Sequence, residues 1–357
     1  MTNPSRPCTM LADGFSAHHA TLNSKANPGP ASTSALRRQW LAALVATPLA
    51  SRLATARAQG SGPLRVLLPI SAGSGVDVIA RSAQPALIKA FAGQPVVIEN
   101  LPGAGGISGT QALVRATPDG QTIGLLSNNH AVNPSVFRKL PYDGQKDITP
   151  ITVVGGSPFV LVVNPGRIKA SDARALQAEL KAAPDRFNYA SSGNGTVIHL
   201  AGEMFNEAVG VSIRHVPYKG TGPMVTDLIG GQVDYGVVAV GAAQNHLKSG
   251  LLRAIGVMGR NRIGSLPELP TIAEQGFPDV DIAGWILAAG PKGLTEAQVR
   301  RLRDGIVAAF NDPQVKESFA RRDDFLVLST PEESATFLRT EQERYARLVR
   351  RANVSLD

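Results

Sequence analysis

Strand-like and helix-like segments alternate along the chain from Leu64 onward, and this alternation constrains the fold more than any other feature of the sequence. Each strand-like run is short, aliphatic or β-branched, and bounded by Gly, Pro or polar residues. Between the runs, apolar residues recur at three- and four-residue steps, as from Val76 to Phe91, which places them on one helix face. Such alternation predicts α/β layers with mainly parallel strands. We expect strands at residues 64–68, 95–99, 122–126, 159–163, 187–190, 212–216, 233–238 and 252–258.

Two apolar runs followed by Pro and Gly flank a central block of the chain. The first, FVLVVNPGRI, ends near Ile168, and the second, GWILAAGPKGL, begins at Gly284. We interpret both as strands that cross between two lobes, with a two-stranded hinge and a cleft between the lobes. Lobe 1 would comprise residues 62–163 and 288–357, and lobe 2 residues 164–287. A single large sheet is the alternative that the pattern leaves open.

Residues 1–58 have the character of an N-terminal extension followed by an export signal peptide. An arginine pair at 37–38 precedes an apolar stretch at 40–49, and small residues stand at a cleavage position near residue 58. The stretch is shorter than the roughly 20 residues that span a bilayer. The arginine pair also fits a twin-arginine signal, so the Sec and twin-arginine routes both stay open, as does a disordered cytosolic tail.

Charge and cysteine content argue against several classes of function. The chain has 357 residues and a formal charge of +8, but residues 1–58 hold six of its 36 basic residues and one of its 28 acidic residues. The remaining charge of about +3 is too small and too dispersed to indicate a nucleic-acid partner. Cys8, the sole cysteine, falls in the predicted export segment, so the mature chain would have no disulfide, thiolate nucleophile or cysteine-ligated zinc. The histidines lack zinc-ligand spacing, and no motif supports an enzyme or a cofactor.

The segment PISAGSGVD, residues 69–77, follows the first predicted strand and opens the first predicted helix. Val78 stands where a dinucleotide fingerprint has its third glycine, and no Gly-Lys-Ser/Thr follows for a phosphate loop. What remains is a turn of small residues that presents N–H groups at a helix N-terminus, which suits a carboxylate as well as a phosphate. Asp77 would lie in the first helical turn and hold the loop's own N–H groups. An ordinary structural turn is the alternative.

Two further turns, in the predicted second lobe, have the same character. YASSGNGTVIHLAGEMF (residues 189–205) runs from strand through a Ser/Gly turn into a helix, and VPYKGTGPM (residues 216–224) supplies one cation. Helix N-termini from two lobes that face one cleft would form a clamp for a small anion. The polar segment 127–137 could also line the cleft, through Asn128 or His130. Our candidate ligand-binding residues are Ser71, Ala72, Gly73, Ser74, Gly75, Asp77, Asn128, Ser191, Ser192, Asn194, Thr196, Lys219 and Gly220.

Two other features have a structural interpretation that we prefer. The run GAGG, residues 103–106, is more typical of a close-packing turn than of a ligand contact. His199 would lie one turn into the second-lobe helix and hold backbone or a neighbouring loop. An exported hydrolase that uses Ser192 and His199 is the alternative, although the G-x-S-x-G elbow of hydrolases is absent.

Seven segments follow one another from about residue 62 to the end: PISAGSGVDVIAR, GQPVVIENLPGAGGISGTQAL, ATPDGQTIGLL, NYASSGNGTVIHLAGEMF, HVPYKGTGPMVTDLIGGQVD, LPELPTIAEQGFPDVDIAGW and TPEESATFLRTEQERYARLV. In this order they resemble the extracytoplasmic solute receptors of the tripartite tricarboxylate transporter family, the Bug receptors. This resemblance implies a two-lobed, type II-like periplasmic binding protein fold with two crossing hinge strands. It also implies that a small carboxylate, such as a di- or tricarboxylate, an acidic amino acid or an aromatic acid, is bound and delivered to a large and a small membrane subunit.

From the resemblance we expect a periplasmic monomer without catalytic activity, cofactor or metal. A ligand-responsive sensor that signals to a membrane partner is the alternative function. Three residues of the first loop depart from the family pattern and bear on the choice of acid. Ile70 stands where Phe is usual, Ser74 interrupts a run of glycines, and Val76 replaces a small polar residue.

Overall fold

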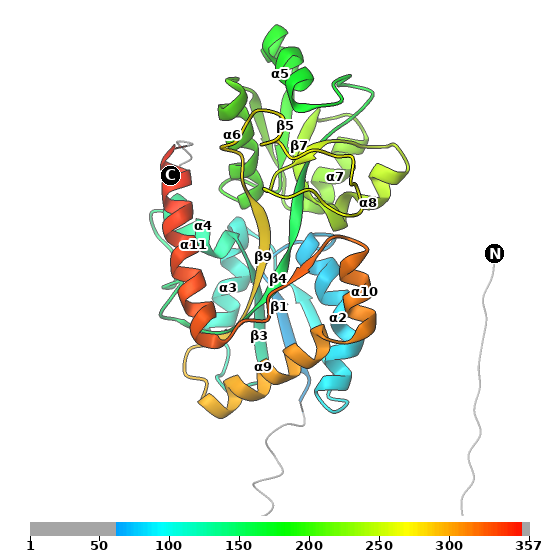
Figure 1. Ribbon diagram of the computed structural model, residues 1–357. Coiled ribbons are helices and arrows are strands. Elements are labelled where there is room, and N and C mark those ends of the chain that lie inside the picture. The colour runs from blue at the N-terminus through cyan, green and yellow to red at the C-terminus, as the bar shows by residue number, and fades with distance from the viewer. Residues whose placement is uncertain (1–61, 352–357) are drawn as a thin grey trace, which may run out of the picture. The chain divides into compact units, whose positions relative to one another are not determined.

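The structure, a computed structural model, describes residues 62–351, so the predicted export segment at residues 1–58 lies outside the described residues. Helices and strands alternate as the sequence predicts (Figure 1). The first part contains β1 (Leu64–Leu68), α2 (Gly75–Ala90), β2 (Val96–Asn100), η1 (Ala104–Gly106), α3 (Ile107–Val114), β3 (Thr122–Ser127), α4 (Asn129–Val136) and β4 (Ile148–Val163). The middle part contains α5 (Ala173–Ala182), η2 (Pro184–Arg186), β5 (Asn188–Ser191), α6 (Val197–Val209), β6 (Arg214–Pro217), α7 (Thr221–Ile229), β7 (Tyr235–Ala239), α8 (Val240–Lys248) and β8 (Arg253–Val257). The last part contains β9 (Ala283–Pro291), α9 (Glu296–Phe310), α10 (Pro313–Ala320), β10 (Phe325–Leu326) and α11 (Pro331–Arg351).

The strands form one hydrogen-bonded series in the order β2-β1-β3-β9-β4-β7-β5-β6, with β8 and β10 also paired to β4. Pairing is parallel at both ends of the series, where β1 pairs with β2 and β3, and β5 with β6 and β7. Every pairing of β4 and β9 is antiparallel. The prediction of mainly parallel strands is therefore wrong for the centre, because the chain leaves along β4 and returns along β9.

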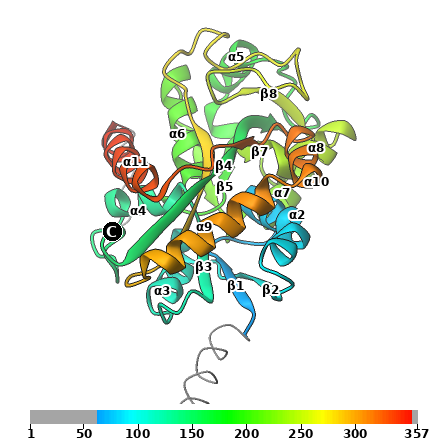
Figure 2. The same ribbon diagram turned by 60° about the horizontal axis from the view of Figure 1, so that its bottom comes forward.

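β4 belongs to both ends of the sheet. Its residues 148–158 pair with β9, whereas residues 159–163 pair with β7 and β8. Figures 1 and 2 show β4 and β9 running between a half that carries α2, α3, α9 and α10 and a half that carries α5 to α8. We call the half built on β1–β3 lobe 1 and the half built on β5–β8 lobe 2. Two strands join the lobes, as predicted. Because β4 pairs in both lobes, the strands also form one continuous sheet, which is the arrangement that the alternative interpretation described.

The apolar periodicity of the first helix is confirmed by burial. Val76, Ile79, Ala83, Leu87 and Phe91 are each less than 9% exposed and pack against β1 in one of the two hydrophobic clusters of the described residues. α9 adds its own apolar face to this cluster, and α11 packs beside α4 and β4. Within residues 62–351, no helix has the length and apolar character needed to span a membrane.

Candidate ligand-binding cleft

A cavity of about 680 Å³ lies between the lobes, a volume typical of small-molecule sites. Its lobe 1 wall comes from the loop after β1 (69–71) and the turn before α3 (102–106). Its lobe 2 wall comes from the loops before α6 (192–194 and Thr196) and before α7 (217–220). A second cavity of about 50 Å³ shares three lining residues with the first and extends to the N-terminus of α2.

The loop after β1 is held from behind by Asp77, which is 4% exposed. Its Oδ2 accepts from the Gly73 N–H at 3.0 Å, and its Oδ1 accepts from Arg81 Nε at 2.9 Å and from Asn100 Nδ2 at 3.0 Å. Ser74 caps α2, since its Oγ accepts from the Asp77 N–H at 3.2 Å. Asp77 thus holds an N–H group of the loop, as predicted, and it lines neither cavity.

The loop before α6 is fixed by side chains of its own segment. Thr196 caps α6 by accepting from the His199 N–H at 3.3 Å, and it donates to the Gly193 carbonyl at 2.8 Å. Ser192 donates to Thr196 Oγ1 at 3.2 Å. The φ values of Gly193 and Gly195 are +137° and +69°, in the left-handed range that favours glycine. The glycines of this turn are therefore required by its backbone path.

Two side chains of lobe 1 accept hydrogen bonds from helix N-termini of lobe 2. Ser71 Oγ accepts from the Thr221 N–H of α7 at 3.1 Å. Asn129 Oδ1 accepts from the Val197 N–H of α6 at 2.8 Å. The lobes approach closely here, because a Cβ atom added to Gly220 would lie 2.2 Å from Ser71 Oγ. The two loops therefore meet directly across the cleft.

The walls of the cleft favour a negative charge. The N-cap residues of three helices, Ser74 of α2, Thr196 of α6 and Gly220 of α7, line the two cavities, and helix N-termini carry partial positive charge. Lys219 is the only charged side chain among the described residues that line either cavity. Tyr218 also lines the larger cavity, and its hydroxyl donates to Asp227 Oδ2 at 2.8 Å. Burial and this contact raise the pKa of Tyr218 to about 12.

The structure brings most of the predicted residues to the two cavities. Those on the wall of the larger cavity are Ser71, Ser192, Asn194, Thr196, Lys219 and Gly220. Those on the wall of the smaller cavity are Ser74, Gly75, Asn128 and again Ser192. Those that line neither are Ala72, Gly73, Asp77 and Ser191.

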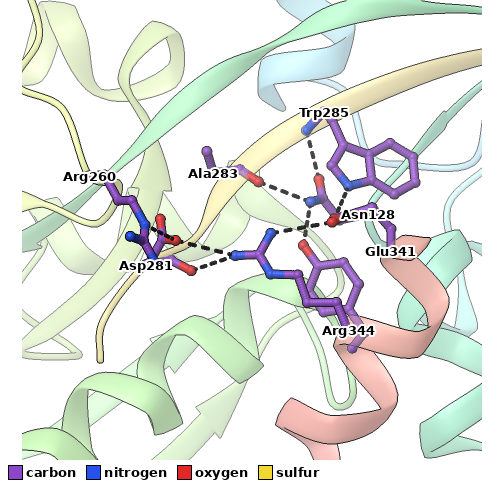
Figure 3. Close-up of polar contacts among 8 residues, drawn as sticks. Asn128, Arg260, Asp281, Ala283, Trp285, Glu341 and Arg344 are labelled. Atoms are coloured by element: carbon purple, nitrogen blue, oxygen red, sulfur yellow. Dashed lines mark hydrogen bonds and ion pairs between the residues drawn. The ribbon is translucent and has the colours of Figure 1, made fainter. Parts of the chain in front are cut away.

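Asn128 lines the smaller cavity, but its amide is engaged with the crossing strand β9 (Figure 3). Its Nδ2 donates to the Ala283 carbonyl at 3.0 Å, and its Oδ1 accepts from the Trp285 N–H at 2.9 Å. The same Nδ2 lies 2.6 Å from Tyr345 Oη on α11. These contacts tie lobe 1 to β9 and leave little of the amide for a ligand.

α11 is fastened to the segment that leads into β9 (Figure 3). Arg344 Nη2 donates to the Asp281 carbonyl at 2.8 Å, and Arg260 Nε donates to Asp281 Oδ2 at 2.7 Å. Glu341 accepts from Trp285 Nε1 at 2.7 Å. The C-terminal helix therefore braces one of the two hinge strands.

His199 holds the neighbouring loop, as we expected, since its Nδ1 accepts from the Gly195 N–H at 3.1 Å. Ser192 instead bonds Thr196, so Ser192 and His199 do not form the pair that the hydrolase alternative needs. The serine that contacts a histidine is Ser191, whose Oγ lies 2.7 Å from His215 Nε2, and Ser191 is fully buried. The geometry therefore does not support the Ser192–His199 pair of the hydrolase alternative.

Several lining residues were not among the candidates. The turn 103–106 packs closely, because a Cβ on Gly106 would lie 2.8 Å from the Pro69 carbonyl oxygen, but all four of its residues also line the larger cavity. Phe137 adds an aromatic ring to the same wall. Asn129 lines both cavities, and its only signal in the sequence was its place in the polar segment 127–137.

The two lobes, the crossing strands and the cleft between them define a solute-binding protein of the periplasmic binding protein fold. The sequence matches the family described as "Tripartite tricarboxylate transporter family receptor" over residues 79–354. Protein BugT of Bordetella pertussis is 35% identical over 296 residues, which are 82% of this chain and 90% of that protein. The chain belongs to the tripartite tricarboxylate transporter receptor family.

Solved structures agree with this assignment. The periplasmic binding protein BugD is 30% identical and superposes with a TM-score of 0.79, covering 82% of this chain and 99% of that chain. The R. palustris protein Rpa4515, solved with adipate, is 27% identical and also has a TM-score of 0.79, covering 83% of this chain and 99% of that chain.

Proposed function

We propose that this chain captures a small carboxylate between its lobes and delivers it to the large and small membrane subunits of a tripartite tricarboxylate transporter. The observation that carries the proposal is the charge of the cleft, where three helix N-termini and Lys219 meet no acidic side chain among the described residues that line the two cavities. Carboxylates are stabilised at helix N-termini. The adipate bound by a family relative supports this class of ligand.

The ligand would lie between the first loop, residues 71–75, and the second-lobe loop, residues 191–196, with Lys219 at the third turn. Di- and tricarboxylates, acidic amino acids and aromatic acids all fit these requirements. The apolar residues Ile70 and Phe137 on the lobe 1 wall would contact the body of the acid. Loop N–H groups and hydroxyls would then receive its carboxylate.

Binding would stabilise the arrangement in which the lobes meet. Ser71 and Asn129 already link lobe 1 to the N-termini of α7 and α6. A ligand that contacts both lobes adds to these links and shifts an open–closed equilibrium toward the closed form, since a ligand favours the state that it binds better. The membrane subunits would recognise that closed form.

The division of the chain follows from the same scheme. We propose that residues 62–163 and 288–357 form lobe 1, and that residues 164–287 form lobe 2, with β4 and β9 as the crossings. We also propose that residues 1–58 export the chain to the periplasm by the Sec or twin-arginine route. The mature protein would act as a monomer and as a binder without catalysis.

A thermal-shift screen of the mature protein tests the proposal. The panel contains adipate, citrate, glutamate and benzoate, with glucose and putrescine as neutral and cationic comparisons. An acid at about 100 times its dissociation constant should stabilise the protein by roughly 2.7 kcal/mol. Stabilisation by the sugar or the amine, with none by any acid, would show that the carboxylate assignment is wrong.

A matched pair of variants tests whether the positive charge of Lys219 contributes to ligand binding. Lys219→Gln should weaken binding of the active acid by about tenfold, because about 1.4 kcal/mol of charge interaction is lost. Lys248→Gln, on the exposed end of α8 away from both cavities, should bind like the parent protein. Equal affinities for the two variants would remove Lys219 from the site.

A further inference from the structure

Two histidines lie directly behind the second-lobe loop 191–196. His199 on α6 and His215 on β6 stack with their ring centroids 3.9 Å apart and their planes inclined by 6°. Tyr189 of β5 lies against the pair, with its ring 4.8 Å from that of His215. His199 is 8% exposed and Tyr189 is fully buried, whereas His215 is partly exposed on β6.

Of the two imidazoles, His199 holds a glycine N–H group of the loop directly and His215 holds one through Ser191. The Gly195 N–H donates to His199 Nδ1 at 3.1 Å. His215 Nε2 lies 2.7 Å from Ser191 Oγ, and this hydroxyl accepts from the Gly193 N–H at 3.1 Å. Gly193 lines the larger cavity together with its neighbours in the loop. The histidine pair therefore adds to the contacts with Thr196 that hold the loop backbone.

The contact with Gly195 defines the tautomer of His199. Because Nδ1 accepts a hydrogen bond, the ring hydrogen is on Nε2, which faces Glu203 Oε1 at 3.7 Å. Among the described residues, His199 is the acceptor for the Gly195 N–H, so a side chain without an acceptor at this position would leave that N–H group unpaired.

The titratable groups around the pair come from every element packed against it. Glu203 of α6 also accepts from the Tyr189 hydroxyl, and Tyr235 of β7 lies 5.8 Å from Tyr189, ring to ring. Burial, and next the neighbouring His199, lower the pKa of His215 to about 4, against the opposing effect of Glu203. Burial raises the pKa values of both tyrosines. His215 is therefore neutral at pH 7.5.

We propose that His199 and His215 are positioning residues of the ligand-binding loop, and that ligand affinity falls when the acceptor that His199 offers to the Gly195 N–H is removed. This inference rests on the proposed role of loop 191–196 in binding.

The first experiment records the Gly193 and Gly195 amide signals by NMR at pH 7.5, in the mature chain without added acid. In His199→Asn the Gly195 signal should stay close to its position in the parent protein, because asparagine Oδ1 keeps an acceptor in the place of Nδ1. In His199→Leu, which lacks the acceptor, the Gly195 signal should move. His246→Asn, on α8, is the matched histidine control and should behave like the parent protein.

The second experiment measures the dissociation constant of adipate for the same variants at pH 7.5. His199→Leu, which lacks the acceptor, should bind about tenfold more weakly than the parent protein, the effect of losing about 1.4 kcal/mol. Its folding is verified by circular dichroism. His199→Asn should recover most of the affinity, because it restores the acceptor.

Three results would overturn the inference: a Gly195 signal that does not move in His199→Leu, an equal loss of affinity in His199→Asn and His199→Leu, or adipate binding by His199→Leu that matches the parent protein. Failure of adipate to bind, with the Gly195 signal moving in His199→Leu as expected, counts against adipate as a ligand and supports the positioning role. The two proposals can therefore fail separately.

Discussion

His130 should make the folded protein sensitive to acid. It lies on α4, is 3% exposed, and its Nε2 is 2.7 Å from the Gly144 carbonyl oxygen. Its Nδ1 is buried and has no hydrogen-bond partner among the described residues, so an added proton would be neither solvated nor paired. Burial lowers the pKa of His130 to about 4, and the Gly144 contact only partly opposes this effect.

The magnitude follows from the two pKa values. The unfolded chain takes up a proton near pH 6.5, and the folded chain only near pH 4. The unfolded state therefore binds more protons in this window, so the stability from neutral His130 is complete above pH 6.5 and is lost as the pH falls toward 4. At about 1.36 kcal/mol per pKa unit the whole loss is roughly 3 kcal/mol, of which about 2 kcal/mol is lost by pH 5.

The test compares urea unfolding of the parent protein and His130→Gln from pH 7.5 to pH 4.5. Glutamine keeps an N–H donor for the Gly144 carbonyl and does not titrate. The difference in the free energy of unfolding should shift by about 2 kcal/mol in favour of the variant between pH 7 and pH 5. Other acid-sensitive groups, such as His215, are present in both proteins and cancel. Parallel pH profiles would refute the reasoning.

Three further changes act on the cleft. Gly220→Ala places a Cβ against Ser71 Oγ, at a residue whose φ of +132° favours glycine. Ligand dissociation, measured by stopped flow, should become at least several times faster. An unchanged rate would contradict the role of this contact. Asn129→Ala removes the acceptor of the Val197 N–H, and small-angle scattering should show a larger radius of gyration than for Asn129→Asp, which keeps the acceptor; equal radii would argue against the link. Ser192→Leu fills the junction of the two cavities and should abolish adipate binding while the melting temperature changes by less than about 2 °C; retained affinity would move the site elsewhere.

The strand and helix positions were predictable where burial is periodic and local. Helix α2 and strands β1, β2 and β3 lie within one or two residues of their predicted positions. β4 was predicted only at residues 159–163, because Pro150, Gly155, Gly156 and Pro158 look like turn residues in the sequence. In the structure this stretch remains a strand, with irregular register opposite β9 between Pro150 and Thr152 and between Val153 and Gly155. Pairing with β9, which is distant in the sequence, makes this stretch a strand, and a local sequence pattern cannot reveal such pairing.

The candidate site was predictable as three turns but not as a set of side-chain directions. Asn128 and Asn129 are neighbours in sequence, yet Asn128 bonds β9 and Asn129 bonds the N-terminus of α6. Successive residues at a helix start point about 100° apart, since a helix has 3.6 residues per turn. Which asparagine faces the cleft therefore depends on how α4 is rotated against its neighbours. The stacking of His199 on His215 likewise needs α6 and β6 side by side, which their 16-residue separation does not reveal.

The strand β4 also determines how the protein can be divided. A cut after residue 163, at the proposed lobe boundary, would leave β7 and β8 without the partner that residues 159–163 of β4 supply. Unpaired strand edges of this kind invite association with other chains. Division at this boundary therefore removes strand pairing from lobe 2, so a stable preparation requires both lobes in one chain.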